Sequence, residues 1–450
     1  MNQDLTKGPV MGSMLRFAVP MILGDLLQQC YNVADTLIVG RYLGKNALAA
    51  VGSSFTLMTF LTSILLGLCM GSGAVFSIRF GQRDEDGLRE GVHASFVLIA
   101  ALTLVLNVLS FACLDYIQAF LRVPDEVWGM MRQYLAVIFC GIAATFLYNY
   151  FASFLRAVGN SVAPLAFLAV SSALNIALDL WFVLGLERGA AGAAEATVIA
   201  QYVSGLGIMA YSLAKHPQLR PRGQFRVRLV CVREIAGFSV LTCVQQSVMN
   251  LGILMVQGLV NSFGSTVMAA FAAAVKIDAF AYMPVQDFGN AFSTFIAQNF
   301  GARQEGRIRR GLKGAVLASA AFCVVISALV WIFAYPLMGL FVEAGDRDTI
   351  LEGVRYLRIE GVFYCGIGCL FLLYGLYRAL GRPGMSVVLT VVSLGTRVAL
   401  AHILSAIPAI GVVGIWWSVP IGWLLADTVG LGCYALRQEQ LLRWDAEKME

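Results

Sequence analysis

Long apolar runs recur along this chain of 450 residues, and they restrict its fold more than any other feature. Most runs are close in length to the roughly 20 residues that a helix needs to cross a bilayer. Lipid cannot satisfy backbone polar groups, so only helices or closed barrels span a membrane. The runs lack the strict alternation of barrel strands, which favours helices. Twelve spans are predicted, at residues 14–38, 47–78, 92–114, 131–153, 161–185, 190–214, 235–261, 267–299, 314–340, 354–377, 384–407 and 411–436.

Composition and motifs exclude several other classes of protein. Only 13% of the residues are charged, whereas soluble domains carry about 25%. The net charge of +5 does not indicate nucleic-acid binding, because the excess cations lie in short loops between apolar runs. No Walker A, HExxH or GxSxG motif occurs, so neither ATP-driven transport nor an enzyme is supported. With only three histidines, neither a metal centre nor a cofactor is expected.

The distribution of Lys and Arg predicts the topology. If the N-terminus is cytoplasmic, most of the 32 Lys and Arg residues fall in segments on the cytoplasmic side. Both termini are therefore predicted to be cytoplasmic, in a multi-pass protein of the bacterial cell membrane. The predicted domains are an N-lobe of six spans at 1–214, a basic cytoplasmic linker at 215–234, and a C-lobe of six spans with a short cytoplasmic tail at 235–450.

An internal repeat relates the two halves. Phe80-Gly81-x-Arg83-x-Glu85 recurs beginning at Phe300, and Arg156-Ala157-x-Gly159 recurs beginning at Arg378, at nearly the same offset. Each half has six spans, an even number, so both halves enter the membrane with the same polarity. The predicted fold is therefore an all-α polytopic membrane protein with twelve transmembrane helices. They form two pseudo-symmetric lobes, a parallel repeat around a central cavity, as in many transporters.

Ionisable side chains inside the spans mark candidate functional positions. Each costs about 2.5–3.5 kcal/mol on insertion scales, so its presence needs a reason. Asp287 and Asp427 lie near span ends and are interpreted as packing contacts, whereas Arg397 and His402 stay open between packing and substrate contact. The complete set is Asp25, Asp35, Asp179, Lys276, Asp278, Asp287, Arg397, His402 and Asp427.

Two polar stripes make the N-lobe the stronger candidate. Asp35 lies on a broad polar face of the first span, and Ser171, Asn175 and Asp179 follow one another at helical spacing on the fifth. Asn175, one turn before Asp179, can donate a hydrogen bond to that carboxylate. Two buried carboxylates brought close together cannot both stay charged, so a proton or a cation would join them. This pattern predicts a proton or sodium switch.

These features resemble the MATE family, the multidrug and toxic compound extrusion antiporters. The resemblance covers essentially the whole chain, and the matching residues, taken together, are specific to this family. It is carried by Pro20 and by residues 34–40 (ADTLIVG), 151–159 (FASFLRAVG), 175–179 (NIALD) and 295–302 (FIAQNFGA).

The resemblance implies an ion-coupling set in the N-lobe. One branch of the family uses an Asp on span one, an Asn and an Asp on span five, a Thr on span six and a Tyr on span four. In this chain those positions are Asp35, Asn175, Asp179, Thr197 and Tyr134, with Na⁺ possible at the two aspartates. Pro20 leaves a backbone carbonyl without its helical partner and gives span one a place to bend.

The other main branch of the family uses acidic residues in the C-lobe, and Asp278, with Lys276 and Arg397, is the comparable position here. The implied function is a monomeric multidrug antiporter that exports amphiphilic, often cationic drugs or toxic metabolites by alternating access. The coupling ion is H⁺ or Na⁺. The alternative is a flippase for a lipid-linked or polysaccharide precursor, which would need more spans or a strongly cationic cavity.

Overall fold

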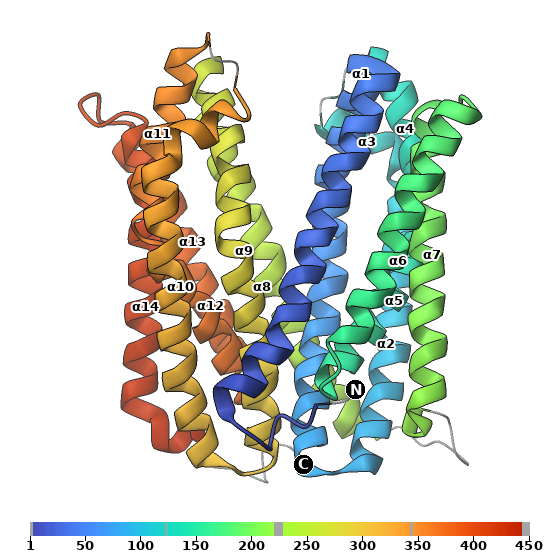
Figure 1. Cartoon of the computed structure of the whole chain (residues 1–450), viewed down its shortest axis with the longest axis vertical. Coiled ribbons are helices and arrows are strands. Elements are labelled where there is room, and N and C mark those ends of the chain that lie inside the picture. Colours follow the sequence, from blue (N-terminus) through green and yellow to red (C-terminus); the bar gives the residue numbers. More distant parts are fainter. Residues whose placement is uncertain (1–2, 122, 124, 220–227, 343–344, 443–450) are drawn as a thin grey trace. The chain divides into compact units, whose positions relative to one another are not determined.

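The computed structural model describes residues 3–121, 123, 125–219, 228–342 and 345–442. Part of the predicted linker, 220–227, and the end of the predicted tail, 443–450, lie outside these ranges. Within them the chain forms helices and turns but no strand (Figure 1). The predicted all-α class is therefore confirmed.

Most of the chain belongs to fourteen α-helices, named α1 to α14 along the described ranges. The first half contains α1 (Val10–Gln82), α2 (Glu85–Ala112), α3 (Leu114–Leu121), α4 (Asp125–Phe139), α5 (Ile142–Ala157), α6 (Val162–Asp179), the π-helix η1 (Leu180–Gly185), α7 (Gly189–Lys215) and the 3₁₀ turn η2 (Pro217–Leu219). The second half contains α8 (Leu229–Asn261), α9 (Ser265–Gly301), α10 (Glu305–Gly339), α11 (Arg347–Gly361), α12 (Tyr364–Ala379), α13 (Pro383–Ser405) and α14 (Val413–Leu442).

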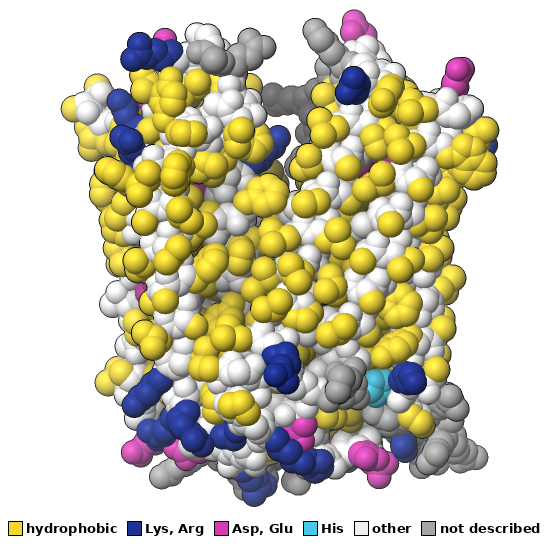
Figure 2. All heavy atoms as spheres, viewed as in Figure 1, with side chains coloured by type: hydrophobic (Ala, Val, Ile, Leu, Met, Phe, Trp, Pro, Cys, Tyr) yellow, Lys and Arg dark blue, Asp and Glu magenta, His cyan; other side chains and the backbone are white. Residues whose placement is uncertain are grey.

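The described helices supply the predicted number of spans. Ten are long and apolar enough to cross a membrane, and two bent pairs bring the total to twelve. The long helix α1 provides two of the spans, because Gly44 interrupts its helical backbone with φ 83° and ψ −175°. The bent pairs are α4 with α5, at 45°, and α11 with α12, at 53°. On the face shown in Figure 2, hydrophobic side chains cover the middle of the helices and Lys and Arg gather near their ends, as a bilayer requires.

The backbone repeats as the sequence does. The left-handed φ angle at Gly44 recurs at Gly264, and the one at Arg83 recurs at Arg303, with the same offset for both pairs. A second set of pairs, which also share one offset, consists of Gly159 with Gly381 and Gly189 with Gly411. Glycine adopts these angles at no steric cost, so it is the expected residue at most of these turns. The two halves therefore share one pattern of turns, which confirms the predicted parallel repeat.

Two compact units form the molecule. Unit 1 consists of Met1–Asp4 and Leu23–Cys243, and unit 2 of Leu5–Ile22 and Val244–Glu450. Both α1 and α8 therefore contribute residues to both units. The lobe boundaries predicted at 214 and 235 stay predictions.

Within unit 1, α8 packs directly on the second half of α1. A Cβ atom on Gly71 would lie 2.5 Å from the Phe238 carbonyl oxygen, and one on Gly67 would lie 2.5 Å from the Cys243 Cα. Small residues permit such close backbone approach between membrane helices. The hydroxyl oxygens of Ser72 and Ser239, 2.8 Å apart, add a buried hydrogen bond at the same crossing.

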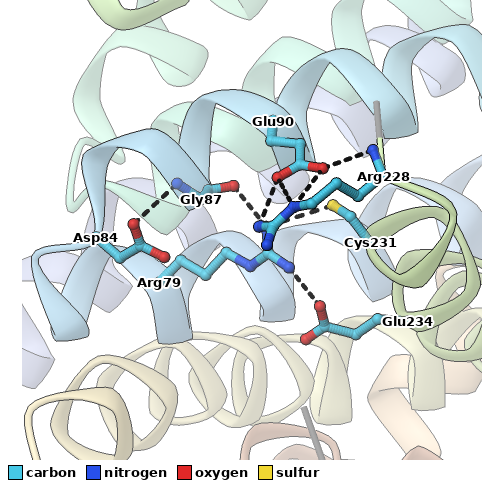
Figure 3. A network of polar contacts seen from close by, with 7 residues as sticks. All are labelled: Arg79, Asp84, Gly87, Glu90, Arg228, Cys231 and Glu234. Carbon is cyan, nitrogen blue, oxygen red and sulfur yellow. Dashed lines mark hydrogen bonds and ion pairs between the residues drawn. The ribbon is translucent and has the colours of Figure 1, made fainter. Parts of the chain in front are cut away.

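A network of polar contacts joins the ends of α1, α2 and α8 in unit 1 (Figure 3). The Arg79 guanidinium forms an ion pair with Glu234 and donates to the Gly87 carbonyl at 2.5 Å. Both side chains of the ion pair are only 9% exposed. Beside it, the Arg228 guanidinium donates to the Glu90 carboxylate at 2.7 Å. The network fixes the beginning of α8 to the first two helices.

Candidate functional site

Unit 1 brings the predicted N-lobe set together from four helices. Asp35 comes from α1, Tyr134 from α4, Asn175 and Asp179 from α6, and Thr197 from α7. The Asn175 amide donates to the Thr197 hydroxyl at 3.2 Å. Asp35 and Asp179 interact electrostatically with each other and with the Tyr134 hydroxyl. The set is one cluster, although its members are widely separated along the sequence.

Several acceptors in this cluster have no donor. Asp179 is completely buried and Asn175 is 2% exposed. Among the described residues, no hydrogen-bond partner reaches Asp35 Oδ1, Asn175 Oδ1 or either carboxyl oxygen of Asp179. Burying a carboxylate without a partner is costly, so the group takes up a proton or binds a cation. Among the described residues, these buried acceptors therefore have no compensating donor or charge.

One predicted contact in this cluster is wrong. Asn175 does not donate to Asp179 one turn away on α6, because its amide group donates to Thr197 on α7 instead. Thr197 in turn donates its hydroxyl hydrogen to the Ala193 carbonyl at 3.0 Å, which leaves the hydroxyl oxygen free to accept. The interhelical contact therefore takes precedence over the contact within one helix, and both Asp179 oxygens stay without a partner.

The helix changes its winding directly after Asp179. The π-helix η1 continues α6 from Leu180, and the Leu186 amide donates to the Trp181 carbonyl at 3.0 Å, five residues back. Such π-segments are rare and occur often at functional sites. This wider turn gives α6 a local irregularity next to the buried carboxylate.

Tyr31 also belongs to the cluster, although the sequence analysis did not single it out. It lies one helical turn before Asp35 on α1, and its hydroxyl interacts electrostatically with Asp35 and Asp179. Its position at helical spacing from Asp35 was the signal that could have identified it, because residues at i and i+4 share one helix face.

The available ligands are oxygen atoms of carboxylate, amide and hydroxyl groups. Hard cations prefer such ligands, whereas transition metals select imidazole and thiolate. Within the described part of the chain, no group of three or more His, Cys, Asp or Glu residues could hold a metal ion. The arrangement fits a proton, or a monovalent hard cation such as Na⁺, shared by Asp35 and Asp179.

The predicted C-lobe residues lie in unit 2, in different environments. Asp278 on α9 is 3% exposed and accepts a hydrogen bond from the Tyr364 hydroxyl. Lys276, two positions earlier, is exposed. Arg397 on α13 is half-buried, and its Nε atom has no hydrogen-bond partner among the described residues. Pro20 lies within α1, where the backbone stays helical, so the predicted bend stays a prediction.

Glu360 is a functional candidate that the sequence analysis missed. It is the second-to-last residue of α11, the first half of the bent pair α11–α12, is 3% exposed, and interacts electrostatically with Asp278. It lies inside the predicted span 354–377. An ionisable side chain inside a span was the criterion that selected the other candidates, and Glu360 meets it. Arg355 and Arg358 precede it, and these two charges make the segment resemble a membrane interface.

Comparison with known proteins gives consistent results over nearly the whole chain. The MatE family profile matches residues 20–181 and 240–403. The probable multidrug resistance protein YpnP of Bacillus subtilis is 28% identical over 99% of this chain and 98% of its own length. The multidrug export protein MepA of Staphylococcus aureus is 22% identical over 99% of this chain and 98% of its own length.

Solved structures share the fold. An outward-facing multidrug resistance MATE family transporter superposes with a TM-score of 0.90 at 23% identity, over 98% of this chain and 99% of its own. A MOP superfamily transporter from Pyrococcus furiosus gives a TM-score of 0.92 at 22% identity over the same shares. The latter is described as having a binding pocket of reversed polarity that suggests a different function. Identities this low establish the architecture alone.

Proposed function

This chain belongs to the MatE family, and from that premise we propose that it is a secondary active multidrug efflux antiporter of the cell membrane. It is a multi-pass membrane protein by the ten apolar helices and two bent pairs found among its described residues. We propose that it exports amphiphilic, often cationic drugs or toxic metabolites, in exchange for protons or Na⁺, by alternating access, and that it works as a monomer. The lobes are proposed at 1–214 and 235–450.

One observation carries the proposal of ion coupling. Two buried carboxyl groups, Asp35 and Asp179, interact within one cluster, and three of their oxygens have no hydrogen-bond donor among the described residues. A structural pair of buried acids would be satisfied by cationic or donor side chains. A cluster that leaves its acceptors unpaired provides a place for an ion, so its charge changes when the ion binds or leaves.

The proposed cycle uses this change of charge. Binding of the ion removes the repulsion between Asp35 and Asp179, so α1 can pack more closely against α6. Pro20 is the proposed point where α1 bends, since a proline removes one helical hydrogen bond. A different packing of α1 in the ion-bound and ion-free forms would link the ion gradient to the transport step.

The drug substrates are proposed from the relatives. YpnP and MepA are both named as multidrug proteins. Few fixed charges lie in the described spans, and aromatic residues make up 11% of the chain, so bulky apolar compounds with a weak positive charge are the expected class.

Efflux measured with each ion gradient applied separately tests this function. In vesicles that contain the protein, a proton or a sodium gradient should drive export of dyes, quaternary ammonium compounds or fluoroquinolones. Vesicles with the same gradient but without the protein are the control. If none of these compounds is exported, or if their export depends on neither gradient, the protein is not a multidrug antiporter. Flipping of a lipid-linked precursor would then be the next hypothesis to assay.

The proposed topology leads to a second expected result. A single cysteine introduced at Lys215, the exposed last residue of α7, should react with a membrane-impermeant maleimide only after the cells are permeabilised, because the positive-inside rule predicts a cytoplasmic position for this end of α7. A cysteine at Ala409, in the exposed turn before α14, should react in intact cells. Both reactions are to be measured in a variant without the ten native cysteines. The opposite pattern would reverse the orientation.

A further inference from the structure

The segment Leu5–Gly8, which precedes α1, belongs to unit 2 and is partly buried there. The first residues of a chain are usually poorly ordered unless specific contacts hold them. In this segment, which we call the N-terminal strap, Leu5 is completely buried and Thr6 is 8% exposed. The strap forms turns and bends, so its backbone polar groups need partners outside regular secondary structure.

Two side chains of α9 bind the backbone of Leu5. Its amide donates to Gln298 Oε1 at 3.1 Å, and its carbonyl oxygen accepts from the Asn299 side chain at 3.2 Å. Both α9 residues are completely buried, and a hydrogen bond is stronger where water is excluded. Both backbone polar groups of Leu5 are thus fixed to α9.

Arg307 on α10 holds the rest of the strap. Its guanidinium donates to three backbone carbonyl groups, those of Leu5 at 3.0 Å, Lys7 at 3.2 Å and Gly8 at 2.7 Å. Its Nε atom also donates to Asn299 Oδ1 at 3.0 Å. A guanidinium has five donors in a rigid plane and can bind several acceptors at once, whereas the ammonium group of a lysine is a compact point charge. The strap therefore depends on the shape of the arginine side chain as well as on its charge.

The strap leads into the part of α1 that belongs to unit 2. This part ends at Ile22, and α1 continues in unit 1 from Leu23. Met11 packs on α10, since a Cβ atom on Gly314 would lie 2.5 Å from Met11 Sδ. The first turns of α1 are therefore held on unit 2, whereas Asp35 lies beyond the change of unit.

The other half contains a matching arrangement. α8 also changes unit, because its residues up to Cys243 belong to unit 1 and the rest belong to unit 2. The start of α8 is fixed to unit 1 by the buried ion pair of Arg79 (Figure 3). Asn299 matches Arg79 at the offset that relates Phe80 to Phe300. In each half, the same position thus helps to hold the start of a helix whose remainder belongs to the other unit.

We propose that the N-terminal strap is a fixed anchor of α1. The first turns of α1 stay on unit 2 throughout the transport cycle, and the helix moves beyond Pro20. A helix with a free end could absorb a change of packing at Asp35 by shifting its own first turns. With that end fixed, the change is passed on to unit 2, as in a hinge. The inference rests on the proposed function for this movement, but attachment of the strap can be measured without transport.

A disulfide between Met11→Cys and Gly314→Cys tests whether the anchor stays in place. A Cβ atom on Gly314 would lie 3.0 Å from Met11 Cγ, the place that a cysteine sulfur would take, which suits a disulfide. In a variant without the ten native cysteines, the oxidised and the reduced pair should export dye at the same rate. Loss of efflux on oxidation that dithiothreitol reverses would overturn the proposal, as would failure of the bond to form.

Arg307→Lys tests the strap itself by amide hydrogen exchange of the purified protein. The variant keeps the positive charge but loses bonds to several carbonyl groups, so exchange in residues 5–13 should be about tenfold faster. Dye efflux should fall, because α1 loses its fixed end. Exchange in α12 should stay unchanged, which shows that unit 2 remains folded. Arg309→Lys is the matched control on the same helix, because Arg309 forms an exposed pair with Glu305, and it should change neither exchange nor efflux.

Two results with Arg307→Lys would contradict the proposal. One is unchanged exchange in the strap, and the other is faster exchange together with efflux at the wild-type rate. Failure of the proposed function would appear separately. The wild-type protein would then export none of the compounds, although its strap is protected from exchange and this protection depends on Arg307.

Discussion

Asp35→Asn should abolish efflux driven by an ion gradient while leaving the folded protein in the membrane. The amide is nearly the same size as the carboxyl group but cannot bind and release a proton, so the cluster is fixed in one charge state. Asp179 is completely buried, and both of its carboxyl oxygens lack a hydrogen-bond partner among the described residues. Asp179→Asn should therefore have the same effect. Dye efflux from energised vesicles should fall to the rate of vesicles without the protein.

Asp427→Asn is the matched control for this prediction. Asp427 is also a buried aspartate, at 7% exposure, and its Oδ1 also has no hydrogen-bond partner among the described residues, but it lies on α14 in unit 2. It should affect efflux only mildly if coupling depends on the unit 1 cluster. Wild-type rates in the Asp35→Asn protein would disprove the mechanism. The pair Asp278 and Glu360 would then be the next candidate for the coupling site.

Removal of Arg79 should strongly lower the free energy of unfolding. Its ion pair with Glu234 is buried, and the same guanidinium donates to the Gly87 carbonyl and to the Cys231 sulfur (Figure 3). Loss of one partner from a buried ion pair costs about 3–5 kcal/mol, because the other charge stays buried without compensation. Arg79→Met should therefore lower the free energy of unfolding by this amount, as measured by denaturation in mixed micelles.

Two further variants separate the buried charge from other effects of the substitution. Arg79→Met combined with Glu234→Met should lose much less stability than the sum of the two single variants, since no buried charge is left unpaired. Arg309→Met removes an exposed pair with Glu305, whose side chains are 45% and 54% exposed. It should lower the free energy of unfolding far less than Arg79→Met does, because solvent screens an exposed ion pair. Equal losses for Arg79→Met and Arg309→Met would show that the network does not contribute as proposed.

The spans could be predicted from the sequence because a bilayer imposes a length and a composition on every helix that crosses it. The bends in two spans could not. α4 begins with Asp125 and Glu126, and α11 begins with Arg347 and Asp348, so a criterion based on apolar runs excludes these first turns. The short helix α3 was missed for a related reason, because its eight residues cannot cross a membrane.

The members of the candidate site could be chosen from the sequence, but their contacts could not. Helical spacing and the family resemblance selected Asp35, Asn175, Asp179 and Thr197. Spacing along one helix also suggested that Asn175 would bond to Asp179, whereas the amide bonds to Thr197 on the neighbouring helix. Which of two possible acceptors an amide chooses depends on how two helices are rotated against each other, and a single helix does not contain that information.

The matching left-handed turns have a consequence for engineering and for the history of the chain. The stretch from Gly159 to Gly189 and the stretch from Gly381 to Gly411 are equal in length and begin and end with the same backbone turn. Each could therefore be transplanted into the other half without an insertion or a deletion. A chimera with two copies of the first stretch would have Asn and Asp at the positions now held by Arg397 and Ala401. Gene duplication would then have supplied a common scaffold, on which substitutions at positions such as 397 and 401 gave the two halves different polar side chains.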